Sequence, residues 1–143
     1  RVADPIIIPR IAALYELQSA YLEPKLKKLG VSLNTFHLLM AVQNSGEKVS
    51  QIEIARRLGI SPATLSETVA SHLKKGLLEQ VTSKKDRRVK FLRLTKSSNA
   101  KLKDVRKLLN NLEDIMLAGV AKSNQGTALS VLEVAIQNIE NTL

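Results

Sequence analysis

Two stretches of the sequence combine side chains that suit contact with a polyanion. Residues 61–72 read SPATLSETVASH, and most of the side chains that face outward on a helix there are short and uncharged. Hydroxyl groups can bind phosphates and base edges, and short side chains let the backbone approach them closely. Residues 83–88 read SKKDRR, in which four cations surround one acid, Asp86. These two stretches are the strongest candidates for a binding site.

The candidate contacts fall on three consecutive segments of the chain. A short supporting helix begins with free backbone N–H groups that can bind a phosphate, the next helix offers small polar groups, and the loop offers cations. The predicted site residues are Ser50, Gln51, Ser61, Ala63, Thr64, Ser66, Glu67, Ser71, Lys84, Lys85, Asp86, Arg87 and Arg88. The alternatives are a solvated helix face, for which more Lys and Glu would be expected, and a solvated charged turn.

The distribution of charge points to the same part of the chain. The net charge is +9, and residues 50–95 contribute +6 of it, with ten basic and four acidic residues. A localised basic surface attracts polyanions, with nucleic acid first among them. An even spread of charge would instead be typical of a generally basic soluble protein.

Two short helices around a tight turn must position these side chains. Ser50 and Glu53 have the spacing of a capping box, and Ser61 followed by Pro62 marks a second helix start. The turn that begins at Leu58 is so short that the helices must cross steeply, which predicts a helix-turn-helix. The predicted inward-facing residues are Ile52, Ala55 and Leu58 on the first helix and Leu65, Val69 and Leu73 on the second.

After Gly76 the pattern changes from helical to strand-like. Residues 77–82 and 89–95 contain β-branched and aromatic residues, and the basic loop joins them. We therefore predict a β-hairpin whose tip carries the cations. Its position after the helix-turn-helix favours a contact in a DNA minor groove, because arginine gains from the enhanced negative potential of a narrow groove.

Helical periodicity flanks this region on both sides. Apolar residues recur at helical spacing over residues 10–29 and 33–44, from about 95 to 120, and from about 129 to the end. We expect the SNQG stretch, residues 123–126, to separate the last two helices. The first helix and the last two are apolar on more than a thin stripe, which favours pairing with a second copy of the chain. The alternative is that these helices pack wholly within one chain.

Several chemistries find no support in the sequence. The absence of Cys excludes disulfides and thiolate chemistry, and the two histidines, His37 and His72, stand far apart, so no metal site is expected. There is no phosphate-binding or dinucleotide glycine pattern, no nucleophile lies beside a base, and no cofactor is expected. No apolar run approaches the roughly 18 residues that span a bilayer, and no signal peptide is visible. We expect a cytoplasmic protein that is not an enzyme.

Residues 50–95 resemble the winged helix-turn-helix of the MarR family of bacterial transcription regulators. The motifs that carry the resemblance are Ser50-Gln51, Leu58 to Ser61, Lys75 to Leu77, Asp86 to Arg88 and Leu94-Thr95. The flanking helices match the layout of the family, so the resemblance covers nearly the whole chain as a single domain, residues 1–143. It implies a mainly α fold with a small β-hairpin, in which a DNA-binding lobe over residues 32–95 lies between dimerisation helices over residues 6–31 and 96–143.

The resemblance also implies a function. Members of the family are transcriptional regulators, mostly repressors, that bind double-stranded DNA as homodimers on pseudo-palindromic operators. Each recognition helix would enter a major groove and each wing a minor groove, with Asp86 holding Arg88 by a salt bridge. Many members release DNA when a small aromatic or phenolic ligand binds between the DNA-binding lobe and the dimer helices. Two alternatives remain, a winged-helix protein-interaction module and a sequence-tolerant architectural DNA binder.

The chain departs from the family pattern on its candidate recognition helix and just after the hairpin. Glu67 stands where Arg is frequent, and Ser71 stands where Arg or a similar residue is common, so the operator sequence does not follow from the resemblance. Glu67 can accept a hydrogen bond from a cytosine amino group or face water. His72 stands where an apolar residue is usual, which we interpret as a local shift of the packing face toward Leu73. Ser98 replaces a Gly that is common after Leu-Thr.

Overall fold

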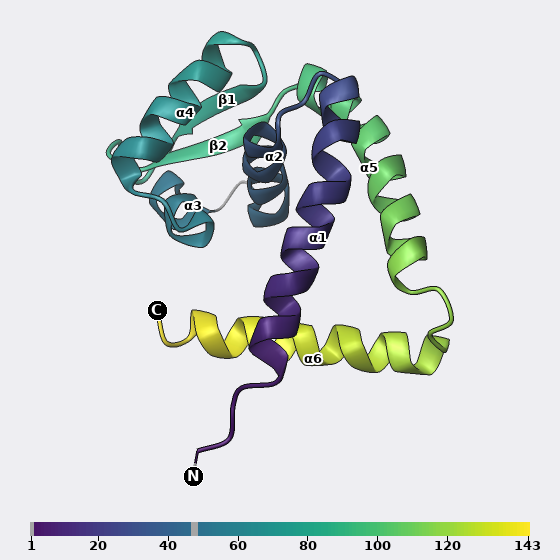
Figure 1. Ribbon diagram of the computed structural model, residues 1–143. Helices are drawn as coiled ribbons and strands as arrows, with labels where there is room; N and C mark the ends of the chain where they lie inside the picture. Colours follow the sequence, from purple (N-terminus) through teal and green to yellow (C-terminus); the bar gives the residue numbers. More distant parts are fainter. Residues whose placement is uncertain (1, 47–48) are drawn as a thin grey trace. The chain divides into compact units, whose positions relative to one another are not determined.

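The computed structural model describes residues 2–46 and 49–143, which form six helices and one antiparallel hairpin (Figure 1). This mainly helical fold with a small β-hairpin confirms the predicted fold class. The chain divides into two compact units, residues 1–108 and 109–143, and α5 begins in the first and ends in the second. The elements are α1 (Ile7–Lys28), α2 (Leu33–Ser45), α3 (Gln51–Leu58), α4 (Pro62–Lys74), β1 (Leu78–Thr82), β2 (Lys90–Leu94), α5 (Lys96–Met116) and α6 (Lys122–Glu140). No described helix is long and apolar enough to span a membrane.

The first unit contains an apolar core built around α2. This helix contacts α1, α3 and β2 (Figure 1), and it buries Phe36, Leu38, Leu39 and Val42. Leu26 of α1 and Leu92 of β2 are also buried in the first unit. The core therefore consists mostly of aliphatic side chains, as the scarcity of aromatic residues requires.

Serine hydroxyls begin three of the helices in the first unit. Ser32, Ser50 and Ser61 each accept a hydrogen bond from the backbone N–H three residues later, at N···O distances of 3.1, 3.3 and 3.1 Å. All three starts agree with the sequence, which offers Ser32 as a possible cap and predicts helix starts at Ser50 and Ser61. The capping box at Ser50 is only half formed, because the Glu53 side chain pairs with Arg56 instead of returning to the serine.

The turn between α3 and α4 has the tightness that the sequence indicated. Gly59 ends α3 with φ of 68°, in the left-handed region where residues with a Cβ are strained. The N–H groups of Gly59 and Ile60 donate to the carbonyls of Arg56 and Ala55 at 3.1 Å each. Ser61 then caps α4, and the two helices contact one another. The predicted helix-turn-helix is present.

The inward-facing residues of α3 and α4 differ in part from those predicted. On α3 the buried residues are Ile54 and Ala55, while Ile52 is 69% exposed, so its prediction as a core residue is wrong. On α4 the third buried residue after Leu65 and Val69 is His72, and Leu73 is only half-buried. The interpretation of His72 as a shift of the packing face toward Leu73 is therefore wrong. Positions 65, 69 and 72 keep helical periodicity, and hydrogen bonds compensate the polarity of the imidazole.

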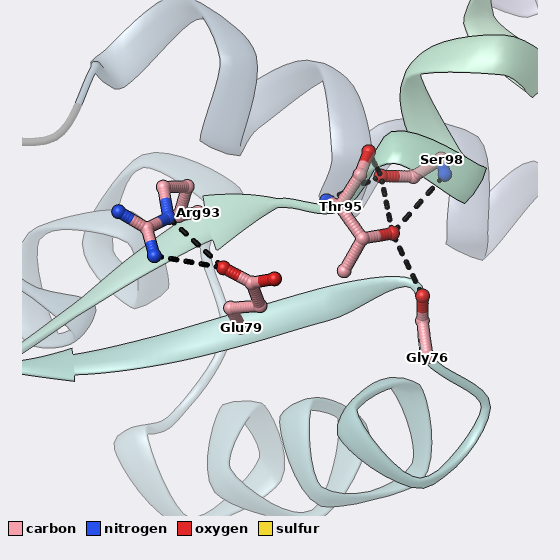
Figure 2. A network of polar contacts seen from close by, with 5 residues as sticks. All are labelled: Gly76, Glu79, Arg93, Thr95 and Ser98. Carbon is pink, nitrogen blue, oxygen red and sulfur yellow. Dashed lines mark hydrogen bonds and ion pairs between the residues drawn. The ribbon is translucent and has the colours of Figure 1, made fainter.

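The predicted β-hairpin follows α4. β1 and β2 pair antiparallel in a register that sets Leu78 opposite Leu94 and Thr82 opposite Lys90. Leu78 and Leu92 are buried, which fixes the register because a slip of one residue would turn them to solvent. On the exposed side, Arg93 donates from Nη2 to Oε2 of Glu79 at 2.8 Å (Figure 2). The hairpin therefore has one face against the core of the first unit.

The end of α5 and the start of α6 differ from the prediction. α5 ends at Met116 and α6 begins at Lys122, so residues 123–126 lie inside α6 instead of separating two helices. The break falls at residues 117–121, where Gly119 adopts φ of 81°. Gly126 is helical, at a cost of about 1 kcal/mol relative to alanine. The presence of a glycine therefore does not show whether a helix ends at Gly119 or at Gly126, because glycine is also tolerated inside a helix.

Candidate nucleic-acid interface

The predicted contacts on α4 lie on its exposed face. Ala63, Thr64, Ser66, Glu67 and Ser71 are all exposed, while the opposite face of α4 is buried in the first unit. These side chains are short except for Glu67, so an approaching partner can come close to the helix backbone.

Ser61 has a defined structural role at the start of α4. Its hydroxyl oxygen accepts a hydrogen bond from the backbone N–H of Thr64 at 3.1 Å and donates its own proton to Thr64 Oγ1 at 2.9 Å. The one donor of the Ser61 hydroxyl is therefore in use in the free protein. Ser61 positions the start of the exposed face, and the hydroxyls of Ser66 and Ser71 lie farther along it.

The start of α3 is joined to the hairpin. Ser50 forms an isolated β-bridge with Phe91 of β2, and Gln80 of β1 donates from Nε2 to Oε1 of Gln51 at 2.9 Å. These contacts place the first turn of α3 beside the strands that carry the basic loop. Sequence analysis selected Ser50 and Gln51 but missed their partner Gln80, because cross-strand and helix–strand neighbours are not apparent from spacing in the sequence.

The tip of the hairpin is shaped by a serine and a carboxylate. Ser83 Oγ accepts hydrogen bonds from the backbone N–H groups of Lys85 and Asp86 at 3.2 and 3.3 Å. The loop is closed by a bond from Ser83 N to the carbonyl of Val89 at 2.9 Å and by one from Val89 N to the carbonyl of Asp86 at 3.0 Å. Such local bonds hold the loop in one turn conformation. Lys84, Lys85 and Arg87 are exposed on it.

Asp86 fixes the direction of Arg88. The Arg88 backbone N–H and Nε donate to Oδ1 of Asp86 at 3.0 and 3.2 Å, and Nη2 donates to Oδ2 at 3.4 Å. The Arg88 side chain is nevertheless 91% exposed. A planar guanidinium that is gripped along one edge loses rotational freedom while its remaining N–H groups stay available. The salt bridge that the family resemblance implied is present.

The electrostatics of this pair keep Asp86 ionised. Its pKa is lowered below the ordinary value of 3.8, first by the hydrogen bond from the Arg88 side chain and then by the one from the Arg88 backbone. Both bonds favour the charged form of the carboxyl group. At neutral pH the carboxylate is therefore fully charged, and it holds the arginine.

Titration of Asp86 provides a direct measurement of this clamp. The favourable contribution of the pair is complete above the unfolded-state pKa and is lost as the pH falls through the lowered folded-state pKa. In Arg88→Ala the pKa of Asp86 should rise toward 3.8 but stay below it, because the backbone N–H of residue 88 still donates. Side-chain carboxyl chemical shifts measured by NMR between pH 2 and 7 would test this. An unchanged Asp86 pKa in the variant would contradict the side-chain bond.

The three predicted segments meet around a hollow of about 480 Å³. Ser50 and Gln51 of α3, Ser66 of α4 and Arg88 of the loop all line it. Its floor is apolar, with Pro62, Leu65 and Val69 of α4 among the lining residues. The tertiary structure thus brings together residues that are up to 38 positions apart in the sequence.

Ile52 and Lys90 are among the residues that line this hollow and that the sequence analysis did not select for the site. Lys90 is separated from the basic loop by Val89 alone, so a longer window for the charged run would have included it. The exposure of Ile52 carried no comparable signal, because an apolar residue at helical spacing is usually in the core. Among the described residues no group of three or more His, Asp or Glu side chains could hold a metal ion.

A family model matches the segment that contains the candidate site. Residues 29–89 match a family model described as the MarR family. This match covers the helix-turn-helix and the hairpin as far as the end of the basic loop. It confirms the family that the sequence motifs resembled.

Solved structures share the fold over nearly the whole chain. A MarR family transcriptional regulator from Silicibacter pomeroyi superposes with a TM-score of 0.84 at 20% identity, covering 95% of this chain and 91% of the other. A MarR protein from Peptoclostridium difficile gives 0.79 at 19% identity, with 99% and 92% covered. The MepR protein of S. aureus, solved in a complex with DNA, gives 0.71 at 15% identity, with 94% and 99% covered. At these identities the likeness establishes the fold alone.

Proposed function

Through residues 29–89 the chain belongs to the MarR family, and on this premise we propose that it is a sequence-specific DNA-binding regulator of transcription. It acts as a homodimer on a pseudo-palindromic operator and, as in most members of the family, as a repressor. The observation that carries the proposal is the meeting of the α3 start, Ser66 of α4 and the clamped Arg88 around one hollow.

The recognition helix in this proposal is α4. A major groove about 12 Å wide admits a helix whose outer side chains are small, and the exposed residues of α4 meet that condition. Ser66 and Ser71 would donate to phosphates or base edges, and Ala63 and Thr64 can bring methyl groups to thymine. The N-terminus of α3 lies beside it and offers N–H groups to a phosphate.

The wing in this proposal is the loop between β1 and β2. Arg88 enters the minor groove next to the major groove that holds α4, and Lys84, Lys85 and Arg87 bind the flanking phosphates. The clamp by Asp86 supports this role, because an arginine held in one direction loses less conformational entropy when it binds. The concentration of positive charge in residues 50–95 supplies the long-range attraction.

The apolar surface of the flanking helices supports the homodimer. α6 has no buried residue in the single chain, and large apolar side chains along it are exposed: Leu129, Val131, Leu132, Val134, Ile136 and Ile139. The first half of α1 is similarly exposed at Ile7, Ile8, Ile11 and Leu14. Soluble monomers rarely expose contiguous apolar patches of more than a few hundred Å². A second copy of the chain would cover these helices.

Selection of duplexes from a randomised library by the purified protein tests the proposal. We expect an inverted repeat that binds at least about a thousandfold more tightly than a scrambled duplex at physiological salt. Equal binding of both duplexes with a steep salt dependence would instead indicate an architectural DNA binder. Failure to bind any duplex would indicate a protein-interaction module. Release of the selected duplex by salicylate would test the proposed small aromatic or phenolic effector.

The side chain of Glu67 should determine base preference on the recognition helix. In Glu67→Gln we expect the preference at one base position to change by about 1–3 kcal/mol, because an acceptor for a cytosine amino group is replaced by a side chain that also donates. The measurement is competition among duplexes that differ at single positions. Lys84→Ala is the control, because loss of a phosphate contact should weaken all duplexes alike. Uniform weakening by Glu67→Gln would show that this residue does not read bases.

A further inference from the structure

Two hydrogen bonds hold the C-terminal end of α4. The first involves His72, which is only 5% exposed and whose Nε2 lies 2.9 Å from Oγ1 of Thr35 on α2. The other ring nitrogen, Nδ1, lies 2.7 Å from the carbonyl oxygen of Thr68. A carbonyl only accepts, so Nδ1 carries the proton of the neutral ring, and Nε2 accepts the proton of the Thr35 hydroxyl. The Thr35 oxygen in turn accepts from Ser32 Oγ at 2.9 Å.

The second bond lies just beyond the end of α4. The Thr95 hydroxyl donates to the carbonyl oxygen of Gly76 at 2.7 Å (Figure 2). Thr95 is also paired reciprocally with Ser98, through Thr95 N to Ser98 Oγ at 2.9 Å and Ser98 N to Thr95 Oγ1 at 3.2 Å. The same threonine therefore caps α5 and binds the segment that follows α4.

These two threonines lie where the chain enters and leaves the helix-turn-helix and hairpin. Thr35 is in the first turn of α2, a few residues after α1 ends at Lys28. Thr95 is the last residue before α5 begins at Lys96. The C-terminal end of α4 is thus bonded to α2, and the segment that follows α4 is bonded to the residue that precedes α5.

The geometry makes the far end of α4 sensitive to these bonds. A helix of 13 residues is about 20 Å long at 1.5 Å per residue. A tilt of about 10° at the fixed end would move the other end by about 3 Å, close to the spacing of successive base pairs. Apolar packing has no preferred direction, whereas a hydrogen bond does. Hydrogen bonds at the C-terminal end can therefore define the tilt more narrowly than the core does.

We propose that the hydroxyls of Thr35 and Thr95 are positioning groups that fix the tilt of α4 and thereby set the half-site spacing that the dimer accepts. The proposal rests on the proposed function, since it concerns how the same helix is presented to DNA. Neither threonine belongs to the predicted DNA-contacting residues. Both can therefore be changed without altering the surface that would touch bases.

The matched variants are Thr35→Val with Thr95→Val, which removes both hydroxyls at nearly constant volume, and Thr35→Ser with Thr95→Ser, which keeps them. The chain has no Cys, so spin labels can be attached at Ala63→Cys, at the N-terminal end of α4, and at Lys103→Cys on α5 in each background. Labelled protein is diluted with unlabelled protein, and pulsed electron paramagnetic resonance measures the distance within one chain. We expect a narrow distribution for the parent and serine proteins, and one broader by about 3 Å for the valine protein.

The second measurement uses the duplex selected by the parent protein, together with versions that have one base pair inserted or removed between the half-sites. We expect the preference of the valine protein for the original spacing to fall by about fivefold or more, the factor that corresponds to the loss of one hydrogen bond. Binding to a single half-site duplex should change by less than about twofold, because the contacting surface is unchanged. The serine protein should retain the preference of the parent.

The outcomes separate this inference from the function on which it rests. A distance distribution in the valine protein equal to that of the parent would overturn the positioning role, and so would an unchanged preference for half-site spacing. A serine protein that behaves like the valine protein would also overturn it, because the hydroxyls would then not be the cause. If the parent protein selects no duplex, the proposed function fails, while the distance measurement still decides whether the hydroxyls fix the tilt.

Discussion

Replacement of Ile136 by glutamate should convert the proposed dimer to a monomer and weaken operator binding by about 100-fold or more. Ile136 lies on the exposed apolar face of α6, 57% accessible in the single chain. A carboxylate placed in an apolar interface is costly because it loses water without gaining a partner. A monomer can occupy one half-site only, so it loses the gain in effective concentration that comes from joining two binding surfaces.

Analytical ultracentrifugation gives the mass, and fluorescence anisotropy with the selected duplex gives the affinity. The matched control is Gln137→Glu, which adds the same negative charge to the same helix at an exposed polar position. This control should remain dimeric and bind DNA like the parent. A dimeric Ile136→Glu protein would exclude this face of α6 from the interface, and a monomeric one with full affinity would exclude the requirement for a dimer.

Replacement of Arg88 by alanine should weaken binding to the selected duplex by about 1–3 kcal/mol, or roughly 5- to 150-fold, while the fold is retained. Arg88 is almost fully exposed and its side-chain contact is with Asp86, a neighbour in the same loop. Its removal therefore leaves the core of the first unit untouched. Anisotropy at physiological salt measures the affinity, and thermal unfolding followed by circular dichroism measures the stability. Unchanged affinity would refute the contact of the wing with DNA.

Three further variants distinguish the contribution of the positive charge of Arg88 to DNA binding from the contribution of its fixed orientation. Arg87→Ala removes the same charge from the neighbouring position and should cost less affinity, because a loss at a phosphate mainly lowers the salt slope. Arg88→Lys keeps the charge but cannot reproduce the planar fork that pairs with a carboxylate. Asp86→Asn keeps the arginine but weakens the clamp. If the orientation of the Arg88 side chain matters, the affinities of the last two variants should lie between those of the parent and Arg88→Ala. If the charge alone matters, both variants should bind the selected duplex like the parent.

Local sequence signals located most of the fold correctly. The caps at Ser50 and Ser61, the glycine turn at Gly59 and the change of periodicity after Gly76 each depend on contacts within a few residues, so spacing in the sequence is sufficient to recognise them. The Asp86 and Arg88 pair is of the same kind, since both ends of the contact lie in one turn. These features form through local contacts and do not depend on which residues are brought together by tertiary packing.

The sequence mispredicts residues whose environment does not follow from polarity or helix propensity alone. His72 was set aside from the core because imidazole is polar, yet Thr35, 37 positions away, binds its ring nitrogen. Ile52 was assigned to the core because it is apolar, yet it lies at the rim of the hollow beside the hairpin. Gly126 was expected to end a helix that in fact continues through it. In each case the deciding neighbour or solvent environment is not a local property of the sequence.

By itself, the sequence determined the order of the elements, the helix-turn-helix, the basic hairpin and the resemblance of this segment to the MarR family. These follow from short-range backbone preferences and from a charge distribution that is independent of folding. Only the tertiary structure decided that Ser50, Gln51, Ser66 and Arg88 line one hollow, that Thr35 of α2 is bonded to α4, and that Thr95 is bonded to the segment that follows α4. The reason is physical, because such contacts join residues that become neighbours only when the apolar core closes between them.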